Sequence, residues 1–121
     1  MRLPNPDRAV VDVAKVRDYL LSREHPIGRF KAAVFESHGY RRESWQVLQV
    51  DLWAVALLDG ARLKVTTEYG QLFELPAMLQ TPTQRVLAVI SVWLVAPGEN
   101  IPRLVTVYPG GRRWRTRNAI P

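Results

Sequence analysis

Residues 85–96 read RVLAVISVWLVA, and this stretch decides the fold class of the chain. It is rich in β-branched residues and ends at Pro97-Gly98, a pattern typical of a β-strand. Side chains alternate between the two faces of a strand, and one face here is wholly apolar: Val86, Ala88, Ile90, Val92 and Leu94. We expect that face to be the core, so that Ser91 and Trp93 point away from it, toward solvent or a cleft.

The neighbouring segments predict the rest of a sheet. Residues 62–67 alternate loosely in polarity, residues 69–75 alternate clearly, and Pro76 is expected to end that second strand. Residues 103–108 form a further candidate strand after a short loop. Short loops between consecutive strands make antiparallel pairing the default.

The first half of the chain predicts helices. Apolar residues recur at spacings of three and four from Asp12, a candidate N-cap, to about residues 22–24. A second helix is expected over residues 29–37 and a third over residues 42–58. Helices followed by strands favour an α+β fold, with two to three N-terminal helices packed on a three- to four-stranded antiparallel sheet.

The third expected helix has apolar residues on two sides. One stripe is expected to face the core: Trp45, Leu48, Leu52 and Val55. The opposite side carries Trp53 and Leu57, and exposed apolar surface of this kind usually marks an interface. We therefore expect a homodimer or a tight protein complex through this helix, unless the helix is buried around most of its circumference.

Length and composition fit one domain. A chain of 121 residues with 47% hydrophobic residues is expected to form a helical half (1–60), a sheet half (61–109) and a basic tail (110–121). The absence of cysteine excludes disulfides and thiolate metal sites. We find no apolar signal sequence and no stretch of the roughly 18 apolar residues that a membrane span needs, so we expect a cytoplasmic protein without a membrane partner.

The net charge of +6 favours a polyanionic partner. Of the 17 basic residues 14 are arginine, whose planar guanidinium matches phosphate and carboxylate groups. Four arginines surround Trp114 in the tail, and Arg112 and Arg113 are expected to bind RNA or an acidic protein. The alternative is a solvated chain terminus.

Residues 25–35 read HPIGRFKAAVF and combine a histidine, a turn and a lysine. Pro26 fixes its own φ angle and Gly28 tolerates positive φ, so the turn is specified by the sequence. It brings His25 and Lys31 to neighbouring positions beside the free N–H groups of a helix N-terminus, which together suit a phosphodiester. The same residues would equally serve to cap and brace the helix.

The absence of several motifs excludes the types of catalysis that depend on them. The chain has no phosphate-binding glycine loop, no Gly-x-Ser-x-Gly elbow and no histidine pair at metal-binding spacing, so we expect neither a metal nor a cofactor. The type of catalysis that these absences leave is metal-free acid–base catalysis by side chains. Such catalysis suits RNA cleavage in which the 2′-hydroxyl attacks its own phosphate, because the nucleophile is then in the substrate.

The chain also resembles an uncharacterised bacterial domain family over residues 3–108. The shared motifs are Leu3-Pro4-Asn5, the run from Lys15 to Leu20, His25-Pro26-x-Gly28-x-x-Lys31-Ala32, Tyr69-Gly70, Trp93 and the run from Pro102 to Tyr108. Members of that family occur as small stand-alone proteins and at the C-termini of bacterial and phage polymorphic toxins. The resemblance implies the fold of barnase, EndoU, colicin and RelE-like ribonuclease toxins, with N-terminal helices followed by an antiparallel sheet.

This resemblance implies a site and a function. We expect a small metal-independent ribonuclease of toxin type, controlled by a small cognate antitoxin-like protein. The expected catalytic residues are His25, Lys31, Arg103 and Thr106, and the expected substrate-binding residues are Tyr69, Ser91, Trp93, Tyr108, Arg112 and Arg113. His25 would act as general acid or base. Lys31 and Arg103 would stabilise the phosphorane, unless Arg103 forms an edge ion pair instead.

Two contacts to the RNA each have two candidate residues. Thr106 or Ser91 would orient a phosphate oxygen, and Tyr69 or Trp93 would stack a base. The alternative for Ser91 and Thr106 is that they are ordinary strand residues. The alternative for the whole protein is a non-catalytic basic binding module, of antitoxin, immunity or adaptor type, that binds an acidic protein or a nucleic acid.

Overall fold

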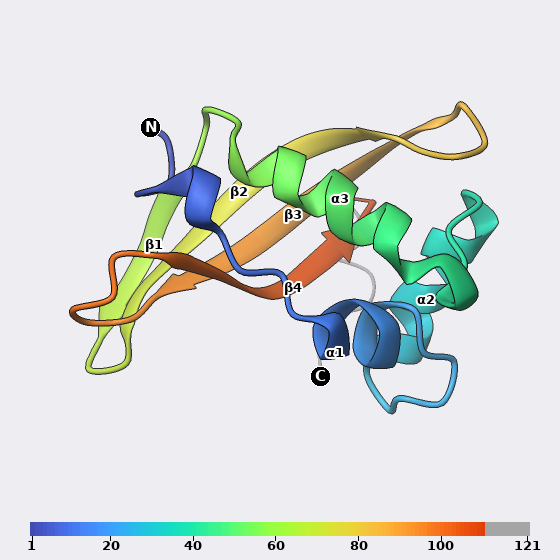
Figure 1. Cartoon of the computed structure of the whole chain (residues 1–121), viewed down its shortest axis with the longest axis horizontal. Coiled ribbons are helices and arrows are strands. Elements are labelled where there is room, and N and C mark those ends of the chain that lie inside the picture. Colours follow the sequence, from blue (N-terminus) through green and yellow to red (C-terminus); the bar gives the residue numbers. More distant parts are fainter. Residues whose placement is uncertain (111–121) are drawn as a thin grey trace.

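The computed structural model describes residues 1–110 and has an α+β fold, in which three helices pack with a four-stranded antiparallel sheet (Figure 1). The strands are β1 (Arg62–Thr67), β2 (Gly70–Gln80), β3 (Val86–Val95) and β4 (Pro102–Pro109). They lie side by side in the order β1-β2-β3-β4, and each neighbouring pair is antiparallel. The predicted fold class is confirmed.

The helices occupy the segments that the sequence indicates. They are α1 (Val13–Lys15), which continues as the π-helix η2 (Val16–Leu20), then α2 (Gly28–Ser37), the 3₁₀ turn η3 (Arg42–Ser44) and α3 (Trp45–Ala56). A further 3₁₀ turn, η1, spans Pro6–Arg8. Gly39 follows α2 with a φ of 94°, as expected of a glycine that stops a helix.

The expected strand break at Pro76 is wrong. β2 continues through Pro76 to Gln80, and Pro76 lies opposite Ile90 of β3. In the described sheet, β1 pairs with β2 only from Gly70 to Glu74. A proline beyond that point costs β2 no hydrogen bond to β1, so the strand tolerates it.

The expected orientation of β3 is also wrong, because the face that carries Ser91 and Trp93 packs against the helices. Trp93 is fully buried in the main hydrophobic cluster together with Val89 and Val95 of the same face. The opposite face is apolar too, so hydrophobicity does not distinguish the two. Ser91 fits inside because its hydroxyl donates to the Leu75 carbonyl (2.8 Å) and accepts from Trp93 Nε1 (2.8 Å).

The three helices meet the sheet in two places. α3 lies across its inner face (Figure 1), with Leu48, Leu52 and Val55 buried as the apolar stripe predicts. η2 and α2 pack against each other and contact β4, the edge strand. No helix among residues 1–110 has the length and apolar character needed to cross a membrane.

Candidate functional site

Side chains from η2, α2 and β4 meet where the two helical segments contact the edge strand. Lys31 Nζ donates a hydrogen bond to the Tyr19 hydroxyl and another to Thr106 Oγ1. The two hydroxyl oxygens are themselves 2.9 Å apart. The three groups therefore form a closed triangle of hydrogen bonds, which we call the Lys31 cluster.

Lys31 is only 2% exposed, which is rare for a lysine. Burial lowers the pKa of its ammonium from 10.5 to about 8, and the nearby charge of Lys15 acts in the same direction. Nζ lies 4.8 Å from the ring centroid of Tyr19 and 4.7 Å from that of Tyr108, so two aromatic rings stabilise the cation. Of the predicted residues, Lys31, Thr106 and Tyr108 are thus brought together.

One hydroxyl proton in the Lys31 cluster is not used by the hydrogen bonds within the cluster. Tyr19 and Thr106 both accept hydrogen bonds from Lys31, and only one of the two hydroxyls can donate in the bond that joins them. The other hydroxyl must find its acceptor elsewhere. Both residues line a cavity of about 610 Å³, and a ligand there would be within reach of that proton.

One lysine, Lys15, and two carboxylates line the cavity, whereas Lys31 lies behind Tyr19 and Thr106 and is not part of the lining. Its lining residues are Asp12, Ala14, Lys15, Asp18, Tyr19, His25, Val105 and Thr106. Lys15 Nζ lies 5.5 Å from the Tyr19 ring centroid. A hydrogen bond from Arg17, aided by Arg42, holds the pKa of Asp18 at about 2. This carboxylate is therefore ionised, and it is already bonded to the two arginines. Asp12 makes no side-chain cap bond to the helix that it precedes.

His25 caps the start of α2 and lies against Tyr19. Its Nδ1 accepts hydrogen bonds from the backbone N–H groups of Ile27 (3.1 Å) and Gly28 (3.0 Å), which places the ring proton on Nε2. The ring is edge to face with that of Tyr19, at a centroid distance of 4.9 Å. The helix N–H groups expected to be free for an anion are therefore partly occupied, and His25 offers a donor rather than a base.

Gly28 allows η2 and α2 to approach each other this closely. A Cβ atom at Gly28 would lie 1.9 Å from the carbonyl oxygen of Tyr19. Gly28 is not among the glycines with positive φ, so its role is close packing and not the left-handed turn that the sequence suggests.

Three predicted site residues serve the fold instead. Ser91 and Trp93 are sealed in the core, where they cannot orient a phosphate or stack a base. Arg103 is half exposed and forms an ion pair with Glu99 at 3.1 Å, which is the structural alternative considered for it. Arg103 does not line the cavity of the Lys31 cluster.

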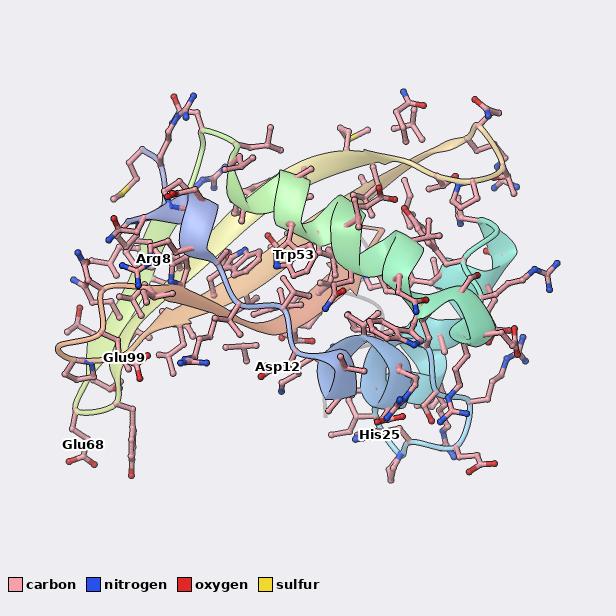
Figure 2. The ribbon with its side chains drawn as sticks, viewed as in Figure 1. Arg8, Asp12, His25, Trp53, Glu68 and Glu99 are labelled. Carbon is pink, nitrogen blue, oxygen red and sulfur yellow. The ribbon has the colours of Figure 1, made fainter. Side chains whose placement is uncertain are left out.

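Other predicted residues lie at a distance or outside the described chain. Tyr69 is 72% exposed in the turn between β1 and β2. Its neighbour Glu68 lies at the opposite end of the molecule from His25 (Figure 2). Arg112 and Arg113 lie outside residues 1–110.

Two residues of the site were missed as candidates. Lys15 and Tyr19 are four positions apart, a spacing that places side chains on one face of a helix. Both also belong to the motif from Lys15 to Leu20 that the family resemblance rests on. That motif was the available signal.

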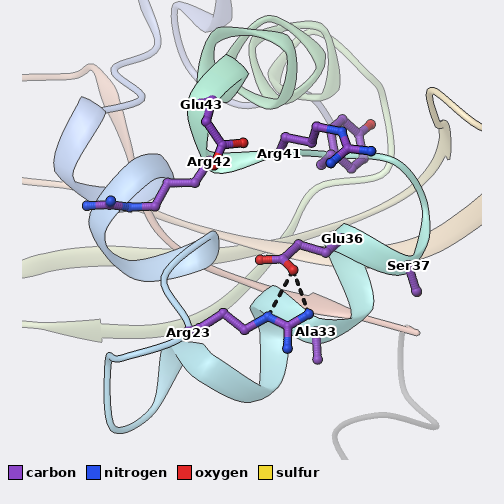
Figure 3. A pocket seen from close by; sticks show the side chains of 8 residues that line it. Arg23, Ala33, Glu36, Ser37, Arg41, Arg42 and Glu43 are labelled. Carbon is purple, nitrogen blue, oxygen red and sulfur yellow. Dashed lines mark hydrogen bonds and ion pairs between the residues drawn. The ribbon is translucent and has the colours of Figure 1, made fainter.

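A second cavity, of about 360 Å³, is lined by residues of α2, of η3 and of the segments that precede them (Figure 3). Most of its charged groups are already matched. Arg23 forms an ion pair with Glu36 at 2.6 Å, and Arg42 forms one with Asp18 at 3.1 Å. The cavity beside Tyr19, which is lined by the two hydroxyl residues of the Lys31 cluster, is therefore the candidate site. Nowhere in residues 1–110 do three His, Asp or Glu side chains gather closely enough to hold a metal ion.

The class of protein that emerges is an α+β domain with a buried lysine, hydrogen-bonded to two hydroxyls, beside a polar cavity. Residues 2–111 match the model of a family described as Domain of unknown function (DUF6883), and the chain belongs to that family. Comparison with curated proteins found no match, and no solved structure matches either.

Proposed function

We propose that the protein is a metal-independent ribonuclease that cleaves RNA by attack of the 2′-hydroxyl on the adjacent phosphate. The observation that carries this proposal is the buried Lys31 cation, bonded to the hydroxyls of Tyr19 and Thr106 in the wall of a cavity. The protein has to supply a base, an acid and positive charge, since the nucleophile belongs to the substrate. The cavity contains candidates for all three.

Lys15 and His25 would bind the scissile phosphate. The Lys15 ammonium supplies positive charge, and the His25 Nε2–H group supplies a hydrogen bond to a non-bridging oxygen. A neutral imidazole whose Nδ1 is held by helix N–H groups works as such a donor. His25 thereby takes a phosphate-binding role in place of the acid–base role expected from the sequence.

Asp12 and Tyr19 would transfer the protons. Asp12 takes the proton of the attacking 2′-hydroxyl as the 2′-oxygen–phosphorus bond forms. Tyr19 protonates the 5′-oxygen as its bond to phosphorus breaks, and the products are a 2′,3′-cyclic phosphate and a free 5′-hydroxyl. Lys31 donates to the Tyr19 oxygen and stabilises the negative charge left there, so Lys31 is a positioning residue and Tyr19 a catalytic one.

The test is cleavage of a short RNA in EDTA, with DNA of the same sequence as the control that lacks the nucleophile. Tyr19→Phe should lower the rate roughly 10²–10⁴-fold, as expected on loss of a proton-transfer group. Tyr69→Phe removes an exposed hydroxyl far from the cavity and should cleave at the wild-type rate. Failure of the wild type to cleave, or full activity of Tyr19→Phe, would overturn the proposal.

We further infer that this ribonuclease acts as a toxin in the cytoplasm and is held inactive by a cognate antitoxin-like protein. The net charge of +6 suits an acidic inhibitor. Expression in bacteria should arrest growth, and Tyr19→Phe should relieve the arrest. A protein that binds RNA without cleaving it, and is harmless in both forms, would be the basic binding module instead.

A further inference from the structure

Few aromatic side chains of this protein are open to solvent, although proteins commonly stack unpaired RNA bases on such rings. Among residues 1–110, those more than a third exposed are Phe30, Trp53 and Tyr69. Trp53 lies on α3, and Glu68, the neighbour of Tyr69, lies at the opposite end of the molecule from His25 (Figure 2). Phe30 is the one of the three that belongs to the segment carrying His25, which lines the cavity of the Lys31 cluster.

Phe30 lies in the first turn of α2 and points away from the core. It is 53% exposed, whereas the buried side of α2 consists of Gly28, Lys31, Ala32 and Phe35. Arg29 donates its backbone N–H to the His25 carbonyl at 3.0 Å, so the helical turn begins at His25. From His25 to Phe30 is therefore about one and a half turns of helix. The exposed ring lies on the same short segment as a residue that lines the cavity.

Arg29 lies against the ring of Phe30 and gives this aromatic surface a cation. Its Cζ atom is 4.8 Å from the ring centroid. Arg29 is exposed and takes part in none of the ion pairs among residues 1–110, so no carboxylate there occupies its guanidinium. Proteins stack unpaired RNA bases on aromatic rings and on guanidinium planes. Phe30 and Arg29, which we call the Phe30 platform, supply both surfaces side by side.

The size and the charge of the Phe30 platform favour a base over a partner protein. Its exposed apolar neighbour is Ile27, and the side chain of a phenylalanine offers roughly 150–250 Å², whereas a stable protein interface buries about 800 Å² on each partner. The charges nearby cancel, because Arg23 is bonded to Glu36 at 2.6 Å and the exposed Glu24 equals the charge of Arg29. Stacking, and not net charge, is therefore the interaction that this surface offers.

We propose that the Phe30 platform stacks an unpaired base of a single-stranded RNA whose scissile phosphate lies in the cavity of the Lys31 cluster. The inference rests on the proposed function for the RNA and for the position of its phosphate. The RNA passes from His25 over the exposed Pro26 and Ile27 to Phe30, so the stacked base belongs to a nucleotide close to the cleaved bond. A duplex holds its bases stacked on one another and offers none to Phe30.

The experiment measures binding by fluorescence polarisation, with a short labelled single-stranded RNA in which fluorine replaces each 2′-hydroxyl. This RNA lacks the nucleophile and is not cleaved during the measurement. Phe30→Ala should weaken binding roughly 5- to 150-fold, the effect expected from the loss of one stacked base. Tyr69→Ala is the matched control, because it removes a 72% exposed ring at a distance from His25, and it should bind like the wild type.

Two further variants separate stacking from other effects of the substitution. Phe30→Tyr keeps the ring and should bind like the wild type, whereas Phe30→Leu keeps only apolar bulk and should bind like Phe30→Ala. The dependence of binding on salt should be the same for Phe30→Ala and the wild type, because stacking releases no counterions. With a duplex of the same sequence, the wild type and Phe30→Ala should bind equally.

Several outcomes would overturn the proposal. They are a wild type that does not bind the single strand at millimolar concentration, equal binding by Phe30→Ala, and wild-type binding by Phe30→Leu. A change in oligomeric state of Phe30→Ala in light scattering, with unchanged RNA affinity, would instead make this surface a contact between copies. The uncleavable RNA keeps the two proposals apart: a protein that binds it through Phe30 but never cleaves natural RNA retains the platform and loses the ribonuclease function.

Discussion

Two buried polar clusters in this protein are built from similar parts and differ in charge and surroundings. Around Ser91, a neutral hydroxyl joins the carbonyl of Leu75 to the indole of Trp93, and the whole group is enclosed in the core. Around Lys31, a cation joins two hydroxyls that line a cavity. The first network satisfies its own groups, whereas the second keeps an ammonium where burial lowers its pKa to about 8. Burying a charge lowers the stability of a protein, so a buried charge beside a cavity indicates a functional site. A neutral network whose groups all bond one another indicates a structural role.

Gly28→Ala should break the Lys31 cluster and have the largest effect on stability. The added Cβ would lie 1.9 Å from the Tyr19 carbonyl oxygen and must push η2 away from α2. We expect the free energy of unfolding, measured in urea, to fall by about 3 kcal/mol or more. Gly98→Ala is the control: its Cβ meets nothing within 4 Å, so only its positive φ should cost about 1–2 kcal/mol. Equal losses would mean that η2 and α2 are not closely packed.

Lys31→Met should abolish RNA cleavage while leaving the protein folded, because Tyr19 and Thr106 still bond each other. The wild type and the variant should also differ in pH dependence. Folded Lys31 releases its proton near pH 8 and the unfolded chain near 10.5, so the unfolded state binds more protons between these values. Wild-type stability should therefore rise with pH in this window, by up to about 3 kcal/mol relative to the variant. Urea unfolding at several pH values measures this, and a difference that does not change with pH would contradict the buried ammonium.

Ser91→Ala should weaken the neutral cluster without touching function. It leaves the buried Trp93 Nε1–H group without its acceptor and the Leu75 carbonyl without its donor. We expect a loss of roughly 1–3 kcal/mol in the free energy of unfolding. RNA cleavage per folded molecule should match the wild type, and reduced cleavage would restore Ser91 to the substrate site. Ser44→Ala, at an exposed serine that makes no side-chain cap bond, controls for loss of a hydroxyl.

Arg103→Ala should have the smallest effect of the four. Its ion pair with Glu99 joins two half-exposed side chains, and such pairs contribute within about 1 kcal/mol. Because Arg103 does not line the cavity, cleavage should stay at the wild-type rate. A large drop in kcat would show that the RNA path extends along β4 beyond the Lys31 cluster.

The predictions from sequence succeeded where one local pattern decided the outcome. The helix stripe of Leu48, Leu52 and Val55 and the antiparallel order of the strands follow from periodicity and from short connections. The orientation of β3 could not be predicted in the same way, because both of its faces are apolar. The prediction for Pro76 failed for a related reason. The length over which β1 pairs with β2 cannot be inferred from the sequence of either strand alone.

The sequence by itself determined the α+β class and the turn that holds His25. It also identified Lys31 as a candidate site residue. Only the tertiary structure decided that Lys31 meets Tyr19 and Thr106, which lie 12 and 75 positions away along the chain. It also enclosed Trp93 and left Trp53 exposed. The physical reason is that local spacing fixes which side chains share a face of one element. Which faces then meet depends on how the elements pack, and that is settled by the whole core at once.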